Sequence, residues 1–123
     1  MSDRPALAPR VLFVEDELSL RISYERYFRP RYRMAFAATG AEAMARLAEE
    51  PPDVAVLDMR LPDTDGVDLL RRIRQAVPGL PVIVTTAYLS IEPQLRVLDL
   101  PFAGYLVKPF DLEELGARID AVL

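Results

Sequence analysis

The chain has 123 residues, 51% of them hydrophobic and 28% charged, which predicts a single globular domain with one modest core. Its formal net charge of -4 argues against a general nucleic-acid surface, and its lack of cysteine and histidine excludes disulfides, thiolate metal sites and imidazole catalysis. No apolar run is long enough to cross a bilayer and residues 1–10 lack the apolar centre of a signal peptide, so we expect a cytoplasmic domain without membrane contact.

The N-terminal part of the chain predicts a strand, a helix and a second strand after a short lead-in. Residues 1–9 are polar and contain proline, so we expect a flexible lead-in to a domain that covers residues 10–123. The apolar run 11–14 is typical of a buried strand. Apolar residues then recur at helical spacing until Pro30, namely Leu20, Tyr24, Tyr27 and Phe28. Residues 33–37 form a second, weaker strand pattern.

The middle of the chain predicts a helix, a strand and another helix. Thr39 and Glu42 form a capping-box pattern at the start of a helix that stops at the proline pair 51–52. Its expected buried stripe is Ala41, Met44, Leu47 and Ala48. The apolar run 54–57, which leads into Asp58, predicts a strand over residues 54–58 that is buried on both faces. A third helical stripe ends before Pro78 and consists of Leu70, Ile73 and Val77.

The C-terminal part predicts two more strand and helix pairs. Residues 81–86 and 104–107 are the strand candidates. A short helix between them is marked by Ile91, Leu95 and Leu98, with Pro93 in its first turn. We expect Asp111 and Glu114 to cap the last helix. Its buried stripe is predicted to be Leu112, Leu115, Ile119 and Val122.

Five predicted strands therefore alternate with five predicted helices. This alternation is typical of an α/β fold in which right-handed crossovers join parallel strands and helices cover both faces of the sheet. The carboxyl ends of parallel strands lie along one edge of the sheet. Residues that follow different strands are therefore expected to meet there.

Five polar side chains reach this predicted edge. Glu15 and Asp16 follow the first strand, and Asp58 ends the third. Thr86 and Lys108 lie at the ends of the fourth and fifth. Lys108 is the only lysine among 15 basic residues, which singles out its compact ammonium group for a specific role. Three carboxylates this close repel one another unless cations offset their charge.

A hard divalent cation is the second partner that such an acid cluster suggests. Magnesium, or manganese in its place, is held by few carboxylates together with waters and phosphate oxygens. A cation beside an ammonium and a hydroxyl suits a phosphoryl group that a carboxylate attacks in line. Asp58 is the best candidate nucleophile, because carboxylates form aspartyl phosphates. The simpler alternative is that these acids only cap turns and helices.

Four motifs in this order resemble the receiver domain of bacterial two-component response regulators. The motifs are VEDE over residues 14–17, VLDMRLPDTDG over 56–66, PVIVTTA over 81–87 and YLVKPF over 105–110. The resemblance extends over residues 11–123 and keeps family-like spacing. It implies a flavodoxin-like, doubly wound (βα)5 fold whose five parallel strands lie in the order 2-1-3-4-5.

The resemblance also implies site roles. Asp58 would accept a phosphoryl group from a sensor histidine kinase or a histidine phosphotransfer protein. The implied ligands of Mg²⁺ or Mn²⁺ are Glu15, Asp16, Asp58 and the backbone carbonyl of Arg60. The groups implied to hold phosphoryl oxygens are Lys108, the Thr86 hydroxyl and the Ala87 backbone N–H. Tyr105 matches the switch aromatic of the family, and Pro109 is expected to follow a cis peptide bond.

The same resemblance implies a signalling role. Phosphorylation would alter an output face that an unknown output domain, a target protein or a second copy of the chain reads. Because the domain would catalyse only its own phosphorylation, we do not expect an enzyme. The alternatives are a phospho-independent interaction module on the same fold and an aspartyl-phosphate hydrolase. Against the hydrolase, its usual second acid two residues after the nucleophile is replaced by Arg60.

Two departures from the family pattern stand out. Residues 99–103 read Asp-Leu-Pro-Phe-Ala where a small glycine-alanine turn is common in the family, which suggests an unusual output partner or dimer geometry. Arg60 and Tyr88 each lie two residues beyond a predicted site residue, at the expected rim of the pocket. Our hypothesis is that these large side chains restrict the water that hydrolyses an acyl phosphate and so lengthen the signal.

Overall fold

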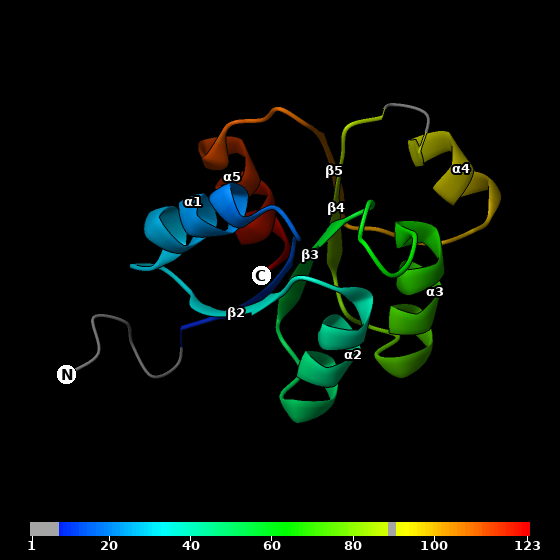
Figure 1. Cartoon of the computed structure of the whole chain (residues 1–123), viewed down its shortest axis with the longest axis horizontal. Coiled ribbons are helices and arrows are strands. Elements are labelled where there is room, and N and C mark those ends of the chain that lie inside the picture. The colour runs from blue at the N-terminus through cyan, green and yellow to red at the C-terminus, as the bar shows by residue number, and fades with distance from the viewer. Residues whose placement is uncertain (1–7, 89–90) are drawn as a thin grey trace.

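The computed structural model describes residues 8–88 and 91–123 and has helices on both faces of one parallel sheet (Figure 1). The strands are β1 (Arg10–Val14), β2 (Arg33–Ala37), β3 (Val54–Asp58), β4 (Val82–Thr86) and β5 (Gly104–Val107). The helices are α1 (Leu18–Phe28), α2 (Gly40–Glu49), α3 (Gly66–Ala76), α4 (Ile91–Val97) and α5 (Leu112–Val122). The strand order β2-β1-β3-β4-β5 confirms the predicted flavodoxin-like fold.

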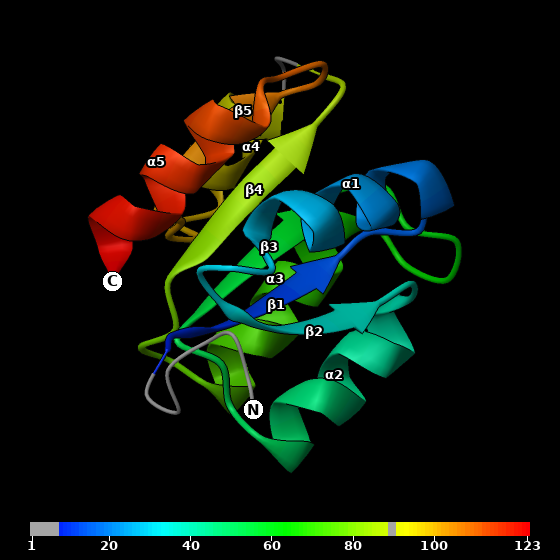
Figure 2. The same ribbon diagram turned by 90° about the vertical axis from the view of Figure 1, so that its left-hand side faces the viewer.

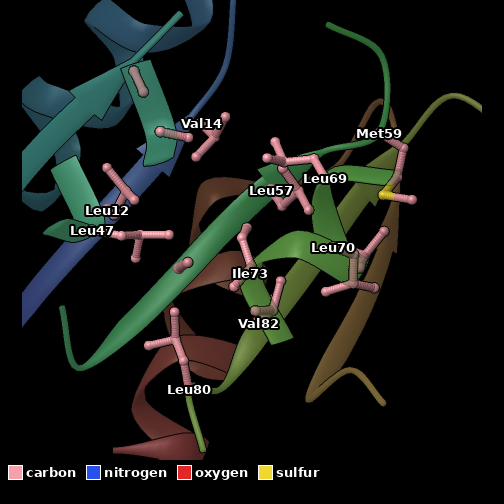
Figure 3. Close-up of a cluster of buried hydrophobic side chains, with 14 of the residues drawn as sticks. Leu12, Val14, Leu47, Leu57, Met59, Leu69, Leu70, Ile73, Leu80 and Val82 are labelled. Atoms are coloured by element: carbon pink, nitrogen blue, oxygen red, sulfur yellow. The ribbon is translucent and has the colours of Figure 1, made fainter. Parts of the chain in front are cut away.

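The sheet separates two hydrophobic layers. Figure 2 shows α1 and α5 together in front of the sheet, with α2 and α3 behind it. The α1 and α5 layer includes Phe13, Tyr24, Phe28 and Ile119, and the opposite layer includes Leu57 and Leu70 (Figure 3). Every residue of β3 and β4 is buried, because helices cover both faces of these central strands. Asp58 and Thr86 therefore lie at the ends of the two fully buried strands.

Some predicted helix faces need correction. The buried residues of α2 are Gly40, Ala43 and Leu47, whereas Ala41 and Ala48 of the predicted stripe are exposed. Alanine is small enough for either face, so its positions do not orient a helix. Tyr27 and Leu98 belong to the apolar stripes that the sequence predicts for the first and fourth helices, but they are 42% and 44% exposed.

Helix capping follows the sequence at α2 and departs from it at α5. The Thr39 hydroxyl accepts a hydrogen bond from the Glu42 backbone N–H at 3.0 Å, as the capping box predicts. Asp111 occupies the N-cap position of α5, but its side chain makes no capping hydrogen bond. The expected Asp111 cap is therefore wrong, since the residue type permits this hydrogen bond without enforcing the side-chain rotamer that makes it.

Only the end of the predicted lead-in lies within the described residues. Residues 1–7 of the expected flexible segment 1–9 fall outside them. Ala8 is buried, and the Pro9 carbonyl accepts a hydrogen bond from the Arg33 backbone N–H at 2.9 Å. The two residues that precede β1 are therefore held against β2. Within the described part of the chain, none of the helices combines the length and apolarity needed to cross a bilayer.

Gly66 allows the loop after β3 to fold back on itself. Its backbone N–H donates to the Met59 carbonyl at 2.9 Å, and Arg60 and Asp65 form an isolated antiparallel bridge. A Cβ atom on Gly66 would lie 2.4 Å from the Met59 Cα. The contact is with backbone, so a rotamer change cannot relieve it. The hairpin-like loop between β3 and α3 therefore requires glycine at this position.

We expect Gly66→Ala to lower the free energy of unfolding by about 1–3 kcal/mol, because the new methyl group overpacks the Met59 backbone. Urea denaturation followed by circular dichroism measures this change. Gly79→Ala is the matched control, since a Cβ at Gly79 would have no atom within 4 Å. Equal stability of the two variants would contradict the requirement for glycine at residue 66.

Candidate functional site

The ends of β1 and β3 bring three carboxylates together. Glu15 and Asp16 follow β1, and Asp58 is the last residue of the neighbouring strand β3. One carboxylate oxygen from each of these residues lies within 4.8 Å of the other two. Glu15 and Asp58 are 1% and 5% exposed, whereas Asp16 is open to solvent. The three acids therefore form a pocket with two buried carboxylates and one that reaches the surface.

Lys108 neutralises part of this acidic charge. Its Nζ atom lies 2.8 Å from Glu15 Oε1 and 3.3 Å from Asp58 Oδ2. The residue directly follows β5, and its backbone N–H donates to the Thr86 carbonyl at 2.7 Å. The peptide bond between Lys108 and Pro109 is cis, as the family resemblance implied. The only lysine of the chain is therefore held between the two buried acids.

Burial governs the charge state of Glu15. Burial raises the pKa of Glu15 to about 7, which the Asp58 charge reinforces and the Lys108 contact opposes. Burial acts to lower the pKa of Lys108, but its contacts with Glu15 and Asp58 outweigh this effect and raise it. One ammonium thus contacts two of the three clustered carboxylates. This all-oxygen donor set with excess negative charge fits a hard divalent cation.

Thr86 is near the cluster, but its hydroxyl is engaged elsewhere. It is buried at the end of β4, and its Oγ1 accepts a hydrogen bond from the Tyr88 backbone N–H at 3.1 Å. Within residues 8–88 and 91–123, no hydrogen bond joins this hydroxyl to Asp58 or Lys108. The preceding Thr85 is paired in register with Asp58, and its buried hydroxyl has no partner among the described residues. Ala87 is exposed immediately after the strand.

Tyr105 connects β5 with the segment around the start of α4. Its hydroxyl donates to the Tyr88 carbonyl at 2.7 Å and accepts from the Glu92 backbone N–H at 3.1 Å. Its half-buried ring lies 5.9 Å from the Phe102 ring. Leu89 and Ser90 lie outside the described residues. The predicted switch residue Tyr105 therefore forms hydrogen bonds with the backbone of Tyr88, before residues 89–90, and of Glu92, after them.

Arg60 and Tyr88 meet at the rim of the pocket. The Arg60 backbone N–H donates to Asp58 Oδ1 at 3.2 Å, and its guanidinium Nη1 donates to the Tyr88 hydroxyl at 3.3 Å. Both side chains are exposed. The sequence placed each residue at the rim separately, because each follows a strand end. It could not reveal their direct contact, which depends on how the loops after β3 and β4 turn toward each other.

In the metal-free protein, we expect stability to fall as pH rises from about 4.5 to about 7. Over this window the unfolded chain loses the Glu15 proton while the folded chain keeps it, so the folded state is disfavoured. The Glu15 contribution is on the order of 3 kcal/mol and is complete above about pH 7. Urea denaturation at several pH values in the presence of a chelator measures it.

The control is a comparison of two glutamate-to-glutamine variants. Glu15→Gln should remove the decline, because glutamine does not titrate. Glu113→Gln changes an exposed residue in the first turn of α5 and should keep the decline. A parent and a Glu15→Gln protein with the same pH dependence would contradict the assignment to Glu15.

Comparison with known proteins identifies relatives that are similar to this chain in sequence. The chain is 38% identical over 122 residues to the transcriptional regulatory protein PrrA of Mycobacterium tuberculosis, which covers 98% of this chain and 52% of PrrA. It is 39% identical over 115 residues to the response regulator MprA of Mycobacterium leprae, which covers 93% of this chain and 50% of MprA. The chain therefore spans about half the length of these curated relatives.

Solved structures show the same fold. The non-phosphorylated HemR receiver domain of Leptospira biflexa matches with a TM-score of 0.81 and 36% identity, covering 93% of both chains. The receiver domain of a Luxo repressor protein from Vibrio parahaemolyticus matches with a TM-score of 0.85 and 32% identity, covering 94% of this chain and 90% of that one. The sequence profile described as "Response regulator receiver domain" matches residues 11–120. With this profile covering nearly all of it, the chain belongs to the response regulator receiver domain family.

Proposed function

We propose that this receiver domain accepts a phosphoryl group on Asp58 from the phosphohistidine of a sensor histidine kinase or a histidine phosphotransfer protein. The observation that carries the proposal is the position of the Asp58 carboxylate. It lies at the end of a buried strand, 3.3 Å from the Lys108 ammonium and beside two further acids. Among the described residues, only Asp58 and Glu15 both belong to the acid cluster and contact the Lys108 ammonium. The two residues lie in the same site.

The transfer exchanges one phosphorus bond for another. An Asp58 carboxylate oxygen attacks phosphorus, the phosphorus–nitrogen bond of the donor breaks, and its electron pair leaves with the imidazole. We assign the binding of Mg²⁺ or Mn²⁺ to Glu15, Asp16, Asp58 and the Arg60 backbone carbonyl. The bound cation supplies positive charge to the phosphoryl oxygens. Lys108, held against Glu15 at the carboxyl end of β5, supplies further positive charge.

Thr86 provides the route from the pocket to α4. Once Asp58 is phosphorylated, the Thr86 hydroxyl exchanges its Tyr88 contact for a phosphoryl oxygen, next to the Ala87 N–H. Tyr88 is then released from the hydroxyl that holds its backbone N–H. Because the Tyr88 carbonyl also holds the Tyr105 hydroxyl, which contacts Glu92, the change reaches the start of α4. Phosphorylation thus changes the relative populations of the conformations of the output face.

This mechanism describes a signalling switch, and we do not regard the domain as an enzyme. We infer a cytoplasmic role, in which an output domain or a target protein reads the change and homodimerisation is one means of doing so. Relatives of about twice this length carry names such as transcriptional regulatory protein, which supports control of transcription through an additional domain. The receiver domain itself, with a net charge of -4, is not expected to contact nucleic acid.

We expect Asp58→Ala to abolish the incorporation of phosphate from acetyl phosphate, because the nucleophilic oxygen is removed. Intact-protein mass spectrometry and phosphate-affinity electrophoresis measure incorporation with and without Mg²⁺. The matched control is Asp99→Asn, which removes an exposed carboxylate and tolerates the positive φ of 54° at that residue. Incorporation that persists in Asp58→Ala, or that is independent of Mg²⁺ in the parent, would contradict the proposal. Multiple turnover of a phosphomonoester would instead favour the hydrolase.

We also expect Arg60→Ala and Tyr88→Ala to lose phosphate several-fold faster than the parent. The hydrogen bond between the two side chains closes part of the pocket rim, and its removal admits water to the acyl phosphate. The decay of the phosphorylated protein after donor removal measures the rate. Tyr88→Phe keeps the ring and deletes only the hydroxyl, so it separates the hydrogen bond from simple bulk. Decay rates equal to the parent in both alanine variants would rule out this shielding.

A further inference from the structure

The loop between β3 and α3 is attached to the N-terminus of α2. Asp63 lies at the tip of this loop, and its Oδ1 accepts a hydrogen bond from the Gly40 backbone N–H at 2.7 Å. Its Oδ2 accepts one from the Ala41 backbone N–H at 3.0 Å. The first amide groups of a helix lack partners within the helix. Asp63 therefore provides hydrogen-bond acceptors for two of these amide groups, which lie 23 and 22 residues before it in the sequence.

Close packing accompanies these hydrogen bonds. A Cβ on Gly40 would lie 2.5 Å from Thr64 Cγ2, so glycine lets the loop tip lie directly against the helix. The hydrogen bonds from Gly40 and Ala41 favour the ionised carboxylate of Asp63 and so lower its pKa. An ionised acceptor forms the stronger type of hydrogen bond with backbone N–H groups. The contact is thus both charged and sterically matched.

Arg60 lies in the same loop, between its base and its tip. At the base, Gly66 donates to the Met59 carbonyl and Arg60 is bridged to Asp65. The Arg60 backbone N–H is held by Asp58 at 3.2 Å. At the tip, Asp63 provides the two hydrogen bonds to α2. The path of the backbone through Arg60 is therefore defined from both ends of the loop.

We propose that Asp63 is a positioning residue for the cation site, because it anchors the loop that carries the Arg60 carbonyl to the first turn of α2. This inference rests on the proposed metal ligands Glu15, Asp16, Asp58 and the Arg60 carbonyl. Among the described residues, no hydrogen bond or ion pair joins the Asp63 side chain to a ligand group of that site. By linkage, a cation bound at the acid cluster strengthens the contact between Asp63 and the α2 amides to the same extent that the contact strengthens cation binding.

Calorimetric titration with MgCl₂ tests the inference. We expect Asp63→Ala to weaken Mg²⁺ binding by about tenfold, as is found for residues that orient metal ligands. Asp63→Asn keeps one acceptor oxygen and should lie between Asp63→Ala and the parent. The matched control is Thr39→Ala, which removes a different cap from the same helix N-terminus and leaves the β3–α3 loop untouched. Its Mg²⁺ affinity should equal that of the parent.

The amide resonances of Gly40 and Ala41 provide a readout that does not depend on phosphorylation. In the parent and in Thr39→Ala they should shift as Mg²⁺ is added, and in Asp63→Ala they should not. Equal Mg²⁺ affinity of the parent and Asp63→Ala would overturn the positioning role while leaving the metal site intact. An equal loss in Thr39→Ala would also overturn it, because helix stability alone would then explain the effect. A parent that binds no Mg²⁺ would overturn the proposed site and this inference together.

Discussion

The contact of Lys108 with Glu15 and Asp58 is the interaction on which the site depends. Two carboxylates buried side by side repel, and each is costly to charge away from water. The ammonium that offsets them comes from the end of β5, whereas the acids come from β1 and β3. The contact therefore requires β1, β3 and β5 to end at the same edge of the sheet. A compact ammonium reaches both carboxylates as a point charge, which the broader guanidinium of arginine does not reproduce.

Tyr88 links the pocket with the surface beyond it. Its backbone N–H is held by Thr86, its carbonyl by Tyr105 and its hydroxyl by Arg60. Tyr88 therefore contacts Thr86, which is predicted to bind phosphate, as well as the predicted switch residue Tyr105 and Arg60 at the rim. A new hydrogen-bond partner for the Thr86 hydroxyl is therefore expected to alter the contacts of Tyr88 with Tyr105 and Arg60, because a movement of the Tyr88 backbone displaces both. The loop after β4 is thus in contact with both the loop after β3 and β5.

Local patterns predicted the fold well where they are repeated over several residues. The bounds of β3 and β5 agree with the residue ranges expected from sequence, because apolar runs between turn residues leave little freedom. The weaker pattern over residues 33–37 also matches the bounds of β2. Single residues were less informative. Asp111 has the right type and position for a cap but forms no capping hydrogen bond. Ala41 and Ala48 fit a helical period but face solvent, since alanine carries little preference for either environment.

The sequence by itself determined the alternation of strands and helices, and with it the convergence of Glu15, Asp16, Asp58 and Lys108 at one sheet edge. That result follows because parallel strands all end on the same side. Only the tertiary structure decided which loops touch, as in the contacts of Arg60 with Tyr88 and of Asp63 with Gly40. Such contacts depend on the path of each loop through space. No periodicity or residue spacing encodes that path, because it is set by packing between segments distant in the chain.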